Sequence, residues 1–152
     1  MSTPLLQMLH RLPFTAALGA PLLEQVAQLA EIKRFAPNEI VFREGDDCHT
    51  LFVVAGGRVT LQMHVPGRGQ VPILSLGAGE VLAWSAVLGD GRMTATARAV
   101  DELELIAVAS KPLLAMCDAH PPFGYALMHG LALAISQRLV ATRLQMLDVF
   151  GK

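Results

Sequence analysis

The sequence predicts a mixed α+β fold, mainly β: an antiparallel β-roll of the double-stranded jelly-roll type, flanked by N-terminal helices and a long C-terminal dimerisation helix. Three observations lead to this prediction. Apolar positions follow a helical period near the N-terminus, change to a period of two from about residue 33, and become helical again after about residue 110. Turn residues recur at short intervals between these points. No helix follows each expected strand, which argues against a parallel sheet.

Composition predicts a single globular domain over residues 1–152, because 53% of the residues are hydrophobic and 16% are charged. A net charge of -1 gives no basic surface for nucleic acid or an anionic membrane. No apolar run reaches the ~18 residues of a membrane helix, and the N-terminus lacks the pattern of a signal peptide. Two cysteines are too few for a zinc or iron–sulfur site. We expect a cytoplasmic protein with free thiols and no metal.

Two helices are expected before the roll. The first is predicted by leucines at helical spacing and ends at Pro13; its apolar positions are Leu5, Leu9 and Leu12. The second follows Gly19 and has Pro21 in its first turn. Its apolar face is formed by Leu22, Val26 and Leu29.

The roll is expected over about residues 33–108. Its strands are separated by turn residues at 36–38, 45–47, 56–57 and 66–69. Residues 59–65 alternate between apolar and polar side chains, as in an antiparallel strand with one wet face, and residues 70–76 are its expected partner. Further strands are expected at 94–100 and 102–108.

Helices return over about residues 110–150. Ser110 is the expected N-cap, and Pro112 fits the first turn of a short helix over 113–120. Pro121 then opens a helix that reaches about Val149 and spans roughly 40 Å. Its apolar residues follow alternating four- and three-residue steps: Met128, Ala132, Ile135, Leu139, Thr142, Met146 and Val149. A second apolar row is formed by Leu133, Val140, Leu144 and Leu147.

Two apolar rows on one helix need two surfaces to pack against. The interpretation that follows is a homodimer through residues 122–150, with the helix between its own roll and a second copy. The alternative is a helix packed wholly on its own domain.

Three segments carry a resemblance to a known family: residues 37–46 (PNEIVFREGD), 51–59 (LFVVAGGRV) and 76–82 (LGAGEVL). In this order and spacing the chain resembles the cyclic-nucleotide-binding domain over residues 14–150, most closely the catabolite-activator and fumarate-nitrate-regulator branch. The resemblance implies a ligand sensor that binds cyclic AMP or cyclic GMP. Related regulators continue into a helix-turn-helix DNA-binding domain, which would begin where this chain ends. We therefore expect no DNA binding, and an effector protein as a further partner.

The family's phosphate-binding cassette falls on residues 79–97, with a short helix expected at 84–88. Two alignments of this chain with the cassette, or registers, are possible. In the favoured register Gly79 and Glu80 form the first turn of the cassette, and Ala83-Trp84 replace the ribose-binding Gly-Glu pair. The family's phosphate-pairing arginine then falls on Met93, with Arg92 beside it. A rival register gives Glu80 the ribose role and Arg92 the phosphate.

The resemblance implies these ligand-binding residues: Glu80, Ala83, Trp84, Ser85, Arg92, Thr94, Ala95 and Thr142. Structural interpretations stay open beside it: Trp84 as a core plug, Arg92 on a solvated loop, Thr94 as an ordinary strand residue and Thr142 as a packing residue. In the favoured register two charge-assisted contacts are missing, which would weaken nucleotide binding by ~10² to 10⁴-fold.

No catalytic pattern appears: the sequence has no nucleophile elbow, no Walker loop and no paired carboxylates beside a histidine. Some relatives hold haem, but the five histidines show no ligand spacing. Two functional hypotheses follow. The first is a stand-alone, homodimeric ligand sensor that is not an enzyme. The second is a degenerate roll that binds no nucleotide and serves dimerisation or protein docking.

Overall fold

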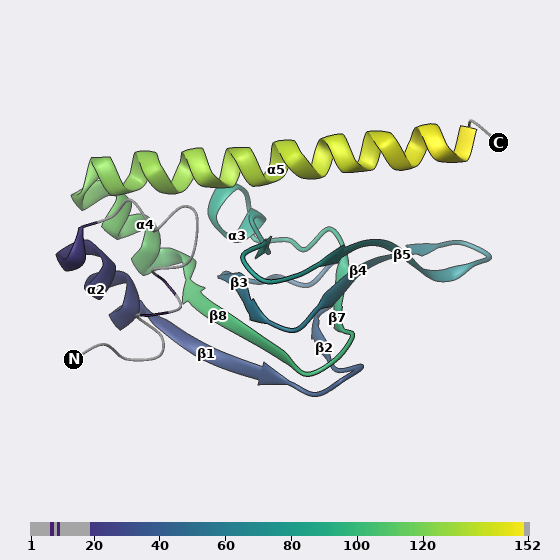
Figure 1. Cartoon of the computed structure of the whole chain (residues 1–152), viewed down its shortest axis with the longest axis horizontal. Helices are drawn as coiled ribbons and strands as arrows, with labels where there is room; N and C mark the ends of the chain where they lie inside the picture. Colours follow the sequence, from purple (N-terminus) through teal and green to yellow (C-terminus); the bar gives the residue numbers. More distant parts are fainter. Residues whose placement is uncertain (1–6, 8, 10–18, 151–152) are drawn as a thin grey trace.

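The computed structural model describes Gln7, Leu9 and residues 19–150, with side chains described as far as Asp148 (Figure 1). Helices lie at both ends of an all-antiparallel roll. In chain order the elements are α2 (Ala20–Leu29), β1 (Ala30–Phe35), β2 (Ile40–Phe42), β3 (Thr50–Gly56), β4 (Val59–Val65), β5 (Gly69–Leu76), β6 (Val81–Leu82), α3 (Ser85–Leu88), β7 (Thr96–Ala99), β8 (Leu103–Ala109), α4 (Ser110–Ala119) and α5 (Pro121–Phe150).

The strands form two four-stranded sheets, in the orders β1-β8-β3-β6 and β2-β7-β4-β5. Neighbouring strands in each sheet pair antiparallel. The two sheets face each other around an apolar interior that includes Phe42, Phe52, Val54 and Leu105. This arrangement confirms the predicted mixed α+β fold with an antiparallel roll.

The central strands β3 and β8 of the first sheet are buried on both faces. On β3, Phe52 and Val54 point into the roll, whereas Leu51 and Val53 join a second core beneath the helices. On β8, Leu105 and Ala107 face the roll and Ile106 and Val108 face the helices. Both strands therefore read as continuous apolar runs rather than as alternating patterns.

The two predicted strands pair as the hairpin of β4 and β5, with Val59 opposite Leu76 and Val65 opposite Gly69. The partner strand begins at Gly69, one residue before the expected start. The half-buried pattern of the hairpin holds only at the base. Val59 is fully buried, but Met63 and Val65 on the same face are 40% and 37% exposed. The prediction of one buried face along the whole strand was wrong here, because the hairpin extends past the roll (Figure 1).

The helix predicted around Leu5 to Leu12 falls largely outside the described residues; of these, Leu9 is helical and buried. The second predicted helix is α2, with Pro21 near its start. Val26 lies in the core beneath the helices, as expected, and Leu23 is buried beside it. Leu22 and Leu29 pack against that core from its edge.

Two predicted helix starts differ in the structure. Ser110 is the first residue of α4 rather than its N-cap; Ala109 takes that position without a side-chain hydrogen bond. The reason is that β8 runs directly into the helix, and the Ser110 N–H donates to the His49 carbonyl instead. Similarly, Trp84 is the N-cap of α3 and the helix begins at Ser85.

Helix α5 has 30 residues and lies along the roll, reaching beyond its strands at one end (Figure 1). Its first turns bury Phe123, Leu127 and Leu131 in the core that also contains α2 and α4 residues. Farther along, six of its large apolar side chains are about half exposed or more: Leu133, Leu139, Val140, Leu144, Met146 and Leu147. No helix among the described residues is long and apolar enough to cross a membrane.

Candidate functional site

Within the cassette, β6 turns into α3 at Ala83. Ala83 has a φ of 64° and is buried, although this left-handed region is one that glycine adopts far more readily. Its carbonyl accepts the Ala86 N–H, which starts the short helix. A left-handed residue at this point is what the favoured register expects, because there Ala83 replaces the family's glycine and Trp84 its glutamate.

The loop that follows α3 is held against the hairpin at residues 45–47. The Met93 N–H donates to the Asp46 carbonyl, and the Met93 carbonyl accepts the Gly45 N–H, both at 2.8 Å. Because side chains alternate along an extended segment, Met93 points into the roll and is 3% exposed, while Arg92 and Thr94 are exposed. Arg92 therefore lies away from the interior of the cassette.

A cavity of about 20 Å³ remains inside the cassette. That volume has room for about one water molecule, so a nucleotide fits only if side chains move. The predicted residues Ala83, Trp84, Ser85, Thr94 and Ala95 all line it. The rest of the wall is Phe42, Leu61, Leu82, Met93 and Arg138.

Arg138 of α5 lines this cavity from the helix side. Its guanidinium carbon lies 4.5 Å from the centre of the Trp84 ring, in the geometry of a cation–π contact. Nη1 and Nη2 are buried and have no hydrogen-bond partner among the described residues. Burial lowers the pKa of Arg138 to about 10, and the charge of Glu80 acts in the opposite direction. The guanidinium is thus still charged at neutral pH.

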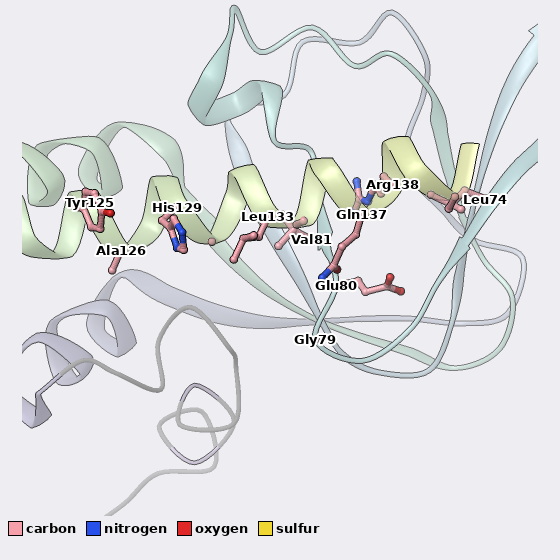
Figure 2. Close-up of a pocket in the computed structure, with 13 residues that line it drawn as sticks. Leu74, Gly79, Glu80, Val81, Tyr125, Ala126, His129, Leu133, Gln137 and Arg138 are labelled. Carbon is pink, nitrogen blue, oxygen red and sulfur yellow. The ribbon is translucent and has the colours of Figure 1, made fainter. Parts of the chain in front are cut away.

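Glu80 lies outside the cavity. Its carboxylate accepts a 2.7 Å hydrogen bond from the Gly77 N–H, and its own N–H donates to the Gly77 carbonyl. The side chain lies beside a groove of about 420 Å³ between α5 and the turn before β6 (Figure 2). Tyr125, His129 and Leu133 follow one another along this groove.

Thr142 lines neither the cassette cavity nor the groove. Its hydroxyl donates a 2.8 Å hydrogen bond to the Arg138 carbonyl, one turn earlier in α5. The structure therefore brings together five of the eight predicted residues and leaves Glu80, Arg92 and Thr142 outside the cavity.

Sequence reasoning missed Arg138. One signal was present: Arg138 precedes Thr142 by four residues, so the two share a helix face. If Thr142 faces the ligand, its neighbour one turn earlier lies on the same side of the helix. Among the described residues, no cluster of three or more histidine, cysteine or carboxylate side chains could hold a metal ion.

Comparison with known proteins bears on the family and the fold. The family profile described as the cyclic nucleotide-binding domain matches residues 32–120. The cyclic AMP receptor protein of Thermus thermophilus is 33% identical over 100 residues, which are 65% of this chain and 44% of that protein. The chain thus matches less than half of that relative.

Two solved structures extend the comparison. The N-terminal domain of a transcriptional regulator from Streptomyces coelicolor is 27% identical, with a TM-score of 0.71 over 91% of this chain and 94% of that one. A cyclic nucleotide-binding domain from Methylobacillus flagellatus shares the fold, with a TM-score of 0.82 at 14% identity over 95% of this chain and 81% of that one. Since the profile covers more than half of the chain and spans the antiparallel roll, this chain belongs to the cyclic nucleotide-binding domain family.

Proposed function

We propose that this chain is a cytoplasmic ligand-sensing regulator, not an enzyme, and that it binds a cyclic nucleotide in the cassette cavity. It acts as a homodimer through α5 and passes its signal to an effector protein. The relationship to a cyclic AMP receptor protein supports a regulatory role. The cassette supports a binding site, because Ala83 keeps the backbone turn that leads into α3.

The observation that carries the proposal is that two elements of the chain touch each other in the wall of the cavity. Trp84 comes from the cassette and Arg138 from α5, and together they leave only about 20 Å³. A ligand that enters must separate these side chains, so occupancy and the position of α5 are linked. Such a link between a ligand and a movable helix is what a sensor requires.

The apolar surface of α5 supports the dimer. Val140 and Leu144 are 50% and 61% exposed, and they lie one helical turn apart. The groove beside the helix is lined by small side chains that allow close approach of another helix: Ala126, Gly130, Ala134 and Ala141. A second copy of α5 is the occupant that we propose, because a two-fold pair buries the same apolar row on both copies.

A second function, docking without a nucleotide, is favoured by one observation. Met93 is buried in the roll at the family's arginine position, and the cavity is nearly filled. In that case Trp84 is a core residue and α5 alone carries the function.

A thermal-shift screen with cyclic AMP, cyclic GMP and cyclic dinucleotides separates the two. A ligand at 100 times its dissociation constant stabilises the fold by about 2.7 kcal/mol, which gives a clear rise in melting temperature. A rise with cyclic AMP or cyclic GMP supports the sensor. No rise with any of these ligands, in a protein that still dimerises, contradicts the sensor and supports the docking module.

A further inference from the structure

In the favoured register Met93 stands at the position of the cassette's arginine, and the cavity has a cation, Arg138, on its α5 side. We infer that Arg138 of α5 is the anion-recognition residue of this site, and that the ligand is a small, flat organic molecule with one anionic group. This inference rests on the proposed function, since it assigns a ligand class to the same cavity. It differs from the family pattern in placing the charge on the helix.

The first support is the state of the guanidinium. Nη1 and Nη2 are sealed from solvent and have no hydrogen-bond partner among the described residues. The charge of Glu80 raises the pKa of Arg138, yet the Glu80 carboxylate accepts the Gly77 N–H and forms no ion pair with Arg138. Burying charged donors without partners is costly. A side chain that only filled space would not need that charge, because methionine or leucine would do the same.

The second support is the chemistry of the wall. Arg138 is the only charged residue that lines the cavity, and Arg92 is exposed on the loop outside it. The free guanidinium nitrogens offer a fork of donors that fits a phosphate or carboxylate in a bidentate arrangement. Phe42, Leu82 and Met93 provide an apolar lining. The face of Trp84 that Arg138 now covers is a stacking surface for a flat ring.

The third support is the position of Arg138 within α5. The Arg138 carbonyl accepts the Thr142 hydroxyl, and the Gln145 side chain donates to the Ile73 carbonyl of β5 at 3.1 Å. An anion held by Arg138 therefore acts directly on the stretch of helix that also contacts the roll. Binding charge on the helix, rather than on the cassette loop, connects the ligand to α5 without an intermediate element.

The test uses the full chain and the fluorescence of Trp84, the only tryptophan. Wild type is compared with Arg138→Gln, with Arg138→Lys, and with the matched control Arg143→Gln, whose arginine is exposed on the same helix. The probes are cyclic AMP, adenosine and inorganic phosphate, which present ring and anion, ring alone and anion alone. Circular dichroism checks that each variant is folded.

We expect cyclic AMP to change the Trp84 emission of wild type and of Arg143→Gln equally. Arg138→Gln should bind it about 10- to 100-fold more weakly, with Arg138→Lys in between, because a charge-assisted, bidentate contact is lost. Adenosine should bind wild type as weakly as cyclic AMP binds Arg138→Gln. Binding of cyclic AMP that is equal in wild type and Arg138→Gln would overturn the inference and leave the proposed function intact.

Two further outcomes distinguish a failure of the cyclic-nucleotide function from a failure of the anion site at Arg138. If cyclic AMP does not bind but inorganic phosphate changes Trp84 emission in an Arg138-dependent way, the anion site stands and the cyclic-nucleotide function falls. If neither anion affects Trp84 in wild type, both fall.

Discussion

The Glu80 carboxylate accepts a 2.7 Å hydrogen bond from the backbone N–H of Gly77, three residues earlier in the chain. This contact closes the turn before β6 and directs the side chain away from the cassette cavity. The geometry therefore favours the register in which Glu80 forms the first turn of the cassette. In the rival register the same carboxylate would have to reach the ribose of a bound nucleotide.

Replacing Glu80 by alanine should lower the free energy of unfolding by about 1–2 kcal/mol, because the Gly77 N–H loses a charged acceptor. Urea denaturation measures this change. Glu24→Ala is the control, since Glu24 is exposed on α2, and it should show no loss. Unchanged stability in Glu80→Ala together with a loss of cyclic AMP binding would instead support the ribose role.

A matched pair of glycines tests the connection between β3 and β4. Gly57 and Gly67 have nearly the same φ, 84° and 83°. A Cβ on Gly57 would overlap the carbonyl oxygen of Glu102, whereas a Cβ on Gly67 would meet nothing within 4 Å. We expect Gly57→Ala to cost more than about 3 kcal/mol in urea denaturation and Gly67→Ala only about 1–2 kcal/mol, the cost of the left-handed backbone alone. Equal costs would show that the backbone near Glu102 shifts freely.

The predicted parts of the fold are those with a strong local signal. The hairpin of residues 59–65 and 69–76 follows from period-two alternation around a turn rich in glycine, and α5 follows from a long helical period after Pro121. The predictions that failed depend on where a segment lies in the tertiary structure. Met63 fits the apolar–polar alternation of a strand with one buried face. Nothing in the sequence shows that the hairpin extends past the roll.

The residues of the candidate site also divide into those with a local sequence signal and those placed by tertiary packing. Ala83, Trp84 and Ser85 could be placed because they are close in sequence to a recognisable turn. Arg138 could not, because it reaches the cavity from a helix some fifty residues later, and only the packing of α5 on the roll brings it to Trp84. The four-residue spacing to Thr142 indicates which face of α5 carries Arg138, but the contact with Trp84 depends on tertiary packing.

Removing the charge of Arg138 should not weaken the fold. Arg138→Met keeps a side chain of similar length against Trp84 and removes a buried cation whose two nitrogens lack partners. We expect the free energy of unfolding to stay equal or to rise by up to about 2 kcal/mol, measured in urea. A loss greater than about 1 kcal/mol would show that the cation–π contact outweighs the cost of burial.

The difference in the free energy of unfolding between wild type and Arg138→Met depends on pH through the pKa of Arg138, which burial lowers to about 10. The pKa of Arg138 in the folded protein is below that in the unfolded chain, so the unfolded state holds the proton more tightly. The free-energy cost of burying the charged guanidinium is therefore relieved only as pH rises above about 10. Between pH 6 and 9 both states are protonated. The difference between wild type and Arg138→Met should therefore be constant over that range.

The Cys117 thiol should react slowly. Burial, and secondly the charge of Asp118, raise its pKa above the ordinary thiol value, so less thiolate is present at pH 8. Mass spectrometry should find Cys117 alkylated by iodoacetamide more slowly in the folded protein than in urea. Asp118→Asn should speed the reaction in the folded protein, and the Glu24→Ala control should not. Equal rates for the folded and unfolded protein would contradict this account.

The exposed apolar row on α5 should hold two copies together. Val140 and Leu144 are 50% and 61% exposed, so aspartate at both positions leaves the roll untouched but places two charges in the proposed interface, where pairing buries them without partners. Wild type should sediment as a dimer at micromolar concentration, and the double variant as a folded monomer with unchanged helix content. Met63→Asp, which likewise replaces an exposed apolar side chain by a carboxylate but on β4, should remain dimeric. A wild type that is monomeric under these conditions, or a double variant that still dimerises, would rule out α5 as the contact between copies.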